Sequence, residues 1–137
     1  MNPAAPPAET NRARLGLKRT ILVVESDSES RELIAEMLRQ SGFKTVTAKD
    51  GLDALNQSAH GSSRIDLLLT ETGVGGIQIN ELLRKLHRRH PGIKLLFMSG
   101  SLDEGFALML GDQAERLFLL KPFTRQALES KVIEVLR

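Results

Sequence analysis

Four polar side chains of this protein each follow a strand-sized apolar run and could together do chemistry. Glu25 and Glu71 carry carboxylates, Ser99 a hydroxyl and Lys121 an amine. Carboxylates bind hard cations such as Mg²⁺, and hydroxyl and amine groups can bind the oxygens of a transferred phosphoryl group. The sequence therefore contains the parts of a phosphoryl-transfer site, provided that the fold brings these side chains together.

The elements that must position these side chains alternate along the chain. Short apolar runs predict strands at residues 21–24, 44–48, 65–70, 93–98 and 117–120. Apolar residues at helical spacing follow each run, in stripes that include Leu38, Leu55, Leu82, Met109 and Val132. Five such repeats predict an α/β fold with a five-stranded parallel sheet, doubly wound with helices on both faces. In such sheets chemistry gathers beyond the carboxyl ends of the strands, where all four polar side chains lie.

Local signals indicate where several helices begin and end. Ser26 and the glutamate three residues after it have the spacing of a capping box, with Asp27 near the positive end of the first helix. Gly42 is expected to end that helix, and Asp50 to cap the next one. The basic segment at residues 87–90 is predicted to be a solvated helix end.

The bulk composition excludes several classes of protein. The 137 residues suffice for one domain. A net charge of +2 gives no argument for nucleic-acid binding, and the apolar runs are far shorter than the ~20 residues that cross a bilayer, so neither contact is expected. The lack of cysteine and of a secretory signal predicts a cytoplasmic protein. Residues 1–18, rich in Pro and Ala, are predicted to be a flexible tail or linker before one domain at residues 19–137.

Five short segments resemble, in order, the motifs of the response-regulator receiver domains of two-component signalling. They are residues 21–25, 50–55, 66–70, 96–100 and 121–123. The sequences of these motifs are most similar to those of receivers of hybrid histidine kinases, and the resemblance covers residues 20–137. It implies the flavodoxin-like (βα)5 receiver fold and a non-enzymatic signalling module of a phosphorelay. It also implies a protein partner (a histidine kinase, an effector or another receiver), with residues 99–123 as a surface for effectors or for a homodimer.

The resemblance also assigns roles to the polar residues. In that family an acidic pair after the first strand holds Mg²⁺, and an aspartate after the third strand accepts the phosphoryl group. Glu25 and Ser26 take the positions of the acidic pair, and Glu71 takes that of the phosphoacceptor. Ser99 and Lys121 take the positions of the hydroxyl and the lysine that bind the phosphoryl oxygens.

Three further residues are assigned less directly by the same resemblance. The main-chain carbonyl of Gly73 takes the position of a metal ligand. Asp27 could turn inward and replace the carboxylate that Ser26 lacks. Phe118 takes the position of the aromatic switch residue of many receivers, although a core phenylalanine fits its surroundings equally well.

Two departures from the family pattern predict a degenerate site. Ser26 removes a carboxylate, so Mg²⁺ is expected to bind weakly, and no cofactor is otherwise indicated. Glu71 places its oxygens about 1.5 Å further out than an aspartate would. A displacement of about 1 Å can lower a rate by roughly 10²-fold. We therefore expect a pseudo-receiver in which Glu71 is phosphorylated rarely or never. Its carboxylate either imitates part of a phosphoryl group near Lys121 and Ser99 or merely pairs with Lys121.

Two alternative functions stay open at the level of sequence. The first is a working phosphoacceptor that uses Glu71 or a displaced carboxylate and takes phosphate from a histidine kinase. The second is a flavodoxin-like protein that binds a cofactor. Such a protein would need a hydroxyl-rich loop after the first strand, and Ser26 and Ser28 supply only part of one. The partner, the oligomeric state and the surrounding protein, whether the chain stands alone or ends a hybrid kinase, also stay open.

Overall fold

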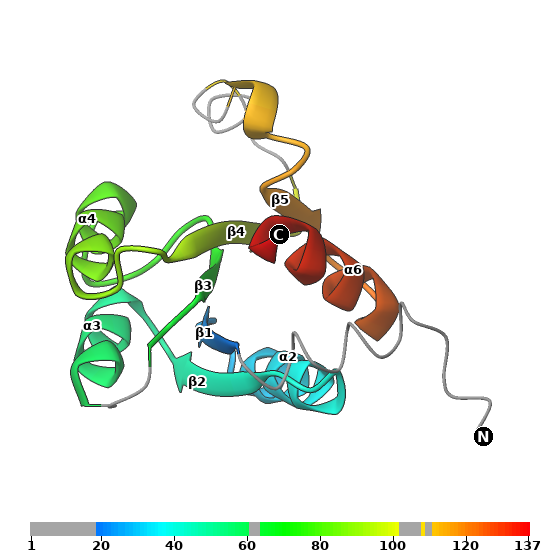
Figure 1. Cartoon of the computed structure of the whole chain (residues 1–137), viewed down its shortest axis with the longest axis horizontal. Coiled ribbons are helices and arrows are strands. Elements are labelled where there is room, and N and C mark those ends of the chain that lie inside the picture. The colour runs from blue at the N-terminus through cyan, green and yellow to red at the C-terminus, as the bar shows by residue number, and fades with distance from the viewer. Residues whose placement is uncertain (1–18, 61–63, 102–107, 109–110) are drawn as a thin grey trace, which may run out of the picture.

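A parallel sheet forms the centre of the fold, as the sequence predicts. The computed structural model describes residues 19–60, 64–101, 108 and 111–137. In this part of the chain the sheet has five parallel strands in the order β2-β1-β3-β4-β5 (Figure 1). The strands are β1 (Thr20–Val24), β2 (Lys44–Ala48), β3 (Leu67–Glu71), β4 (Lys94–Ser99) and β5 (Phe118–Leu120).

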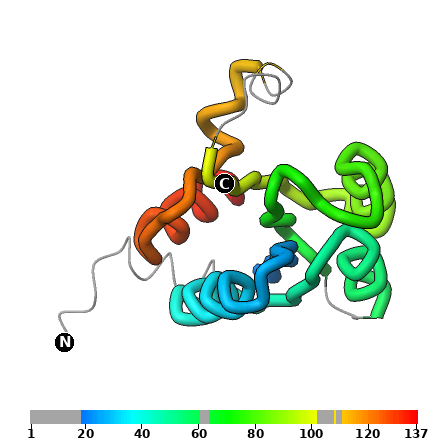
Figure 2. The backbone as a smooth tube through the Cα atoms, turned by 180° about the vertical axis from the view of Figure 1, so that it is seen from behind, coloured from blue at the N-terminus to red at the C-terminus, as the bar shows by residue number. Residues whose placement is uncertain are grey.

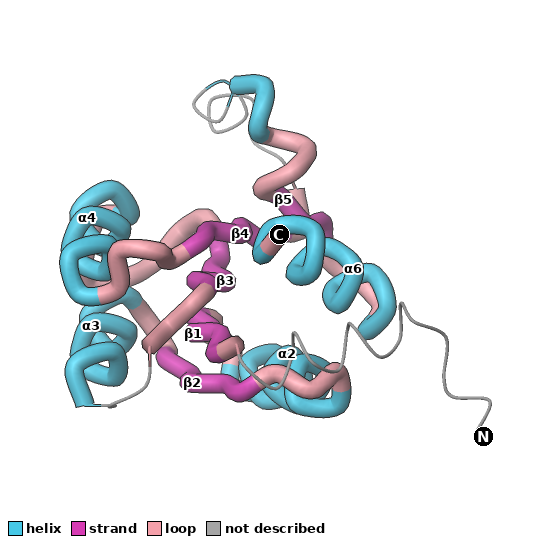
Figure 3. The backbone as a smooth tube through the Cα atoms, in the orientation of Figure 1, coloured by secondary structure: helices cyan, strands magenta, loops and turns pink. Residues whose placement is uncertain are grey.

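Helices cover both faces of the sheet. Figures 1 and 2 show α2 (Ser28–Gln40) and α6 (Arg125–Leu136) on one face, and α3 (Gly51–His60) and α4 (Ile79–Arg89) on the other. The α/β fold class and the doubly wound arrangement are thereby confirmed. A short 3₁₀ helix, η1 (Gly111–Gln113), precedes β5 and stands away from the sheet (Figure 3). The helix predicted around Met109 lies outside the described residues.

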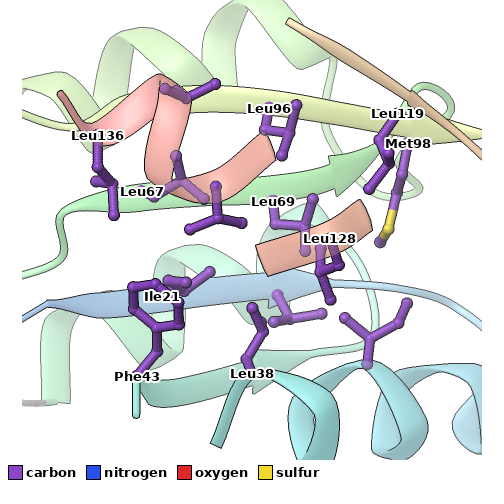
Figure 4. Packing of buried hydrophobic residues seen from close by; sticks show 14 of the residues in the cluster. Ile21, Leu38, Phe43, Leu67, Leu69, Leu96, Met98, Leu119, Leu128 and Leu136 are labelled. Atoms are coloured by element: carbon purple, nitrogen blue, oxygen red, sulfur yellow. The ribbon is translucent and has the colours of Figure 1, made fainter. Parts of the chain in front are cut away.

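Two apolar cores explain why the central strands are apolar at successive positions. Ile21 and Val23 point into the core beneath α2 and α6, which Figure 4 shows with Leu38 and Leu128 among its members. The alternate residues of the same strand point into the second core, beneath α3 and α4. Successive side chains of a strand face opposite sides of a sheet, so a strand covered on both faces is apolar throughout.

The strand register brings the carboxyl ends of four strands to one edge. Val24 pairs with Thr70, Glu71 with Met98, and Ser99 with Leu120. β3 runs from Leu67 to Glu71, whereas the sequence predicted a strand at residues 65–70. The strand therefore begins two residues later and ends one residue later than predicted.

The caps of α2 and α3 are set by aspartates. Asp27 is the N-cap of α2, because its Oδ2 accepts a hydrogen bond of 2.9 Å from the main-chain N–H of Ser30. The capping box predicted for Ser26 was therefore wrong by one residue. Asp50 accepts from the N–H of Asp53 at 2.8 Å, as predicted. Gly42 follows α2 with a φ of 94°, a conformation that glycine adopts without strain.

The basic end of α4 divides into exposed and buried residues. Residues 87–89 are exposed, as predicted, whereas His90 is 7% exposed. The Nδ1 atom of His90 lies 3.1 Å from the main-chain nitrogen of Ile65 and accepts its hydrogen bond. His90 is thus a structural residue that joins the end of α4 to the segment before β3, and the prediction of a wholly solvated end was wrong for it.

Candidate functional site

Glu71 lies at the centre of the carboxyl edge of the sheet and faces the loop between β1 and α2. Its Oε1 accepts a hydrogen bond of 2.8 Å from the main-chain N–H of Ser26. This N–H lies just before the N-terminus of α2, where unpaired amide groups and the helix dipole favour a negative charge. The extra methylene of the glutamate lets the end of β3 reach across to this loop, so the carboxylate has a partner within the protein.

Glu25 and Lys121 form an ion pair across the same edge. The Nζ of Lys121 is 2.5 Å from Oε2 of Glu25, whose side chain is 3% exposed, while that of Lys121 is 27% exposed. The other carboxylate oxygen of Glu25 accepts from the N–H of Asp27 at 3.3 Å. The pairing of Lys121 with Glu71 that the sequence suggested is therefore not the one that forms, and the pairing with Glu25 was not predicted. Glu25 competes successfully because it is buried beside the amine, and a buried carboxylate needs a cationic partner.

Asp27 points its carboxylate at the helix. The main-chain N–H of Ser30, followed by the Ser30 hydroxyl, lowers the pKa of Asp27 below its ordinary value of 3.8. Desolvation opposes this shift, and the charges of Lys121 and Arg31 make smaller contributions that lower the pKa. The carboxylate is thus held in its charged form as a helix cap. Turning it inward to replace the carboxylate absent at Ser26 would break that cap.

Arg31 belongs to the site although sequence analysis did not identify it. Its Nη1 donates to the main-chain carbonyl of Glu25 at 2.9 Å, with the carbonyl of Ser26 at 3.5 Å. The guanidinium therefore ties α2 to the loop that carries both residues. The signal was present in the sequence, because Arg31 lies one helical turn after the N-cap Asp27 and so on the side of the helix that faces the loop.

Ser99 and Phe118 occupy different parts of the last two strands. Ser99 ends β4, its Oγ accepts from the N–H of Ser101 at 3.3 Å, and its carbonyl accepts from the N–H of Lys121 at 2.8 Å. Ser99 and Lys121 are thus held beside each other by the main chain. Phe118 begins β5, pairs with Phe97 in register, and is 7% exposed. Its side chain is buried, as expected of a core phenylalanine.

The donor set does not fit a Mg²⁺ ion well. Glu25 is engaged by Lys121, Asp27 by the end of α2, and Glu71 by the N–H of Ser26. Gly73 lies exposed in the loop after β3. Within the described residues no group of three or more acidic, histidine or cysteine side chains is arranged to hold a metal. Each of the three carboxylates is thus already engaged by a group of the protein.

A groove of about 180 Å³ opens beside Lys121, between α2 and the loop from β5 to α6. Its lining is mostly apolar and includes Leu33, Met37, Pro122 and Phe123. Leu33 is 58% exposed and adds open apolar surface to this lining. The groove shares Lys121 with the ion pair, so the site and an apolar surface adjoin.

Of the helices described, none has the length and apolarity needed to cross a membrane.

Similar proteins were found at the level of family, sequence and structure. The response regulator receiver domain model matches residues 21–133. Sensor kinase CckA of Brucella abortus is 31% identical over 117 residues, which are 85% of this chain and 12% of the kinase. Transcriptional regulatory protein CpxR of Escherichia coli is 34% identical over 123 residues, which are 85% of this chain and 49% of the regulator. The chain thus spans less than half the length of these two relatives.

A solved structure supports the same assignment. The receiver domain of the hybrid histidine kinase CckA has a TM-score of 0.68 and 29% sequence identity, with coverage of 86% of this chain and 99% of that one. The family model covers the sheet except Thr20 and the last helix as far as Ile133, and the polar residues at the carboxyl edge lie within it. The chain therefore belongs to the family of response regulator receiver domains of two-component signalling.

Proposed function

We propose that this domain is a pseudo-receiver, a signalling module that acts through protein contacts without phosphorylation of Glu71. The observation that carries the proposal is the hydrogen bond from the N–H of Ser26 to Oε1 of Glu71. A carboxylate that accepts a phosphoryl group must present a free oxygen in line with the donor. Glu71 instead directs one oxygen at the protein main chain, and its other oxygen lies further from β3 than that of an aspartate.

The charge at the site supports the same proposal. Lys121, which the family pattern would leave to a phosphoryl group, is paired with the buried carboxylate of Glu25. Arg31 holds the loop after β1 through the carbonyl of Glu25. The edge of the sheet is thus held together by groups of the protein itself. An incoming phosphoryl group would have to displace Glu25 from Lys121 and leave that buried carboxylate without its partner, which is costly.

Treatment with acetyl phosphate and Mg²⁺, followed by intact-mass spectrometry, tests the proposal directly. We expect the wild-type protein to gain no phosphoryl group. The Ser26→Asp/Glu71→Asp variant, which restores both carboxylates of the family pattern, is the positive control for donor and conditions. A phosphoryl adduct on the wild type that is lost in Glu71→Gln would instead support the alternative of a working phosphoacceptor.

The partner surface that we propose is the groove beside Lys121. The exposed Leu33 and the half-buried Met37 and Phe123 offer apolar area next to the site. The kinase and regulator relatives carry additional protein beyond the matched region, so a histidine kinase or an effector is the class of partner to test. Leu33→Asp is expected to weaken binding of such a partner, whereas Leu52→Asp, an equally exposed leucine on α3, should not.

The role of the Glu71 charge requires a separate comparison. If the Glu71 carboxylate imitated a phosphoryl group, it would have to contact Lys121 or Ser99. The described side-chain contacts of those two residues are instead with Glu25 and Ser101. We therefore infer that Glu71 acts by holding the loop after β1. Partner affinity should then be similar for wild type and Glu71→Gln, which keeps an acceptor oxygen, and lower for Glu71→Asp, which does not reach Ser26. Loss of binding in Glu71→Gln alone would favour imitation by charge.

A further inference from the structure

A second groove lies on the opposite face of the sheet, between α4 and β4. It has a volume of about 440 Å³. Leu83 and Leu86 of α4 and Leu95 of β4 provide much of its apolar lining. Leu86 is fully buried in the core beneath α3 and α4, and Leu83 and Leu95 pack against that core while remaining partly exposed. The groove is therefore a place where the second core reaches the protein surface.

Basic side chains surround this apolar surface. Arg84, His87 and Arg88 of α4 and Lys94 of β4 line the groove, and all four are exposed. Among the described residues that line it, none is acidic. Arg84 and Arg88 are one helical turn apart, so they present two positive charges in a row along the rim.

The basic residues of the groove differ from their neighbours on α4 in their described contacts. Lys85 pairs with Glu81 at 3.3 Å, and Arg89 donates to the carbonyl of Leu55 at 2.8 Å and to the hydroxyl of Ser58 at 3.0 Å. By contrast, within the part of the chain that the structure describes, the side chains of Arg84, His87, Arg88 and Lys94 make no hydrogen bond or ion pair. The uncompensated positive charge of α4 is thus concentrated where the apolar surface is open.

A ligand that complements this surface must have both an apolar stripe and negative charges beside it. An amphipathic helix places apolar residues at i, i+3, i+4 and i+7 along one face, and its flanking positions can carry glutamates. Its apolar face would cover Leu83 and Leu95, and its carboxylates would meet Arg84, Arg88 and Lys94. Charge complementarity of this kind speeds association and selects the partner. We propose that the groove between α4 and β4 docks an acidic amphipathic helix of a protein partner.

The probe for this proposal is a fluorescein-labelled peptide with leucines in the i, i+3, i+4, i+7 pattern and glutamates at the flanking positions. Fluorescence polarisation measures its affinity for the full chain at low and at high salt. We expect saturable binding that weakens as salt rises, because the rim charges are exposed. A peptide with lysine in place of every glutamate is the control ligand, and it should bind at least about tenfold more weakly.

Two charge-reversal variants locate the binding surface. Arg84→Glu/Arg88→Glu should weaken the acidic peptide by about tenfold or more, because two attractive contacts become repulsive. Lys44→Glu/Lys49→Glu changes the net charge by the same amount on exposed residues at the other edge of the sheet. It should change the affinity by no more than about twofold. Amide NMR shifts on peptide addition should be largest for residues 83–95.

Several outcomes would overturn the proposal. Equal weakening by both double variants would show that the peptide responds only to overall charge. Equal affinity for the lysine peptide, no binding at all, or shifts confined to the groove beside Lys121 would remove the α4–β4 groove as its site. Shifts of residues 83–95 with protein concentration alone would identify a second copy. None of these results depends on whether Glu71 can be phosphorylated.

Discussion

Glu71 Oε1 lies 2.8 Å from the main-chain nitrogen of Ser26, which is 45 positions earlier in the chain. The two residues that depart from the family pattern are therefore in direct contact. The contact uses the main-chain N–H of Ser26, which any residue except proline would supply, so it ties the loop after β1 to the end of β3 without involving the serine side chain.

The first prediction concerns the two residues at positions 26 and 71. Ser26→Asp/Glu71→Asp should be phosphorylated by acetyl phosphate in the presence of Mg²⁺, because it restores a second metal-binding carboxylate and withdraws the acceptor by about 1.5 Å. Each single variant should react far more slowly than the pair, which intact-mass time courses will measure. Equal rates for Glu71→Asp and the double variant would show that Ser26 has no part in metal binding.

The second prediction concerns the ion pair between Glu25 and Lys121. Lys121→Met should lower the free energy of unfolding by about 2 kcal/mol, because it leaves the buried carboxylate of Glu25 without its cation while the partly exposed lysine limits the loss. Glu25→Gln/Lys121→Met should be more stable than the sum of the two single changes predicts, which urea denaturation will measure. Additive effects would mean that the two groups do not interact in solution.

The third prediction concerns the pH dependence of stability. The pKa of Asp27 is depressed in the folded state, chiefly by the N–H of Ser30. Its charged form therefore contributes stability above its ordinary pKa of 3.8, and this contribution is lost as the pH falls through the lower folded value. Asparagine is an equally good N-cap but does not titrate. Asp27→Asn should thus be less stable than wild type at neutral pH, with a smaller difference below pH 3.8.

Circular dichroism during urea denaturation at each pH measures this effect. Asp112→Asn is a suitable control, because Asp112 is exposed in η1 and has no described side-chain partner. A difference between Asp27→Asn and wild type that stays constant across the acidic range would contradict the assignment.

The fourth prediction concerns His90. His90→Ala should destabilise the protein by about 2–3 kcal/mol, because it leaves the buried N–H of Ile65 without an acceptor and opens a small cavity. His90→Asn should recover part of this loss, since its amide oxygen can lie near the position of Nδ1. His87→Ala removes an exposed histidine of the same helix and should change stability by less than about 0.5 kcal/mol. Thermal unfolding of the three variants will compare them.

Much of the fold was predictable because it depends on local pattern. The bounds of β2 follow from the spacing of its apolar residues. The end of α2 near Gly42 and the Asp50 cap follow from the backbone preferences of single residues. The error at Ser26 has a local cause as well. Ser26 and Asp27 are both good N-caps, and a capping box at Ser26 would use the Ser26 N–H, which Glu71 binds instead.

The candidate site was predictable in place but not in its pairings. The parallel topology alone brings the ends of β1, β3, β4 and β5 to one edge, so the position of the polar residues could be inferred from their order. The sequence could not show which carboxylate pairs with Lys121. Glu25 and Glu71 are both at that edge, and only the directions and burial of their side chains distinguish them. The role of Arg31 also depends on where the loop carbonyls of β1 point.

By itself, the sequence determined a doubly wound parallel sheet, the receiver family and the edge on which the polar residues meet, because these depend on periodicity, element order and short motifs. Only the tertiary structure decided that Glu71 binds the loop at Ser26 and that Lys121 binds Glu25, residues 96 positions apart. It also decided that His90 is buried and that the free charges of α4 surround an apolar groove. The physical reason is that such contacts are set by distances of a few ångströms between side chains from different elements, to which no local pattern is sensitive.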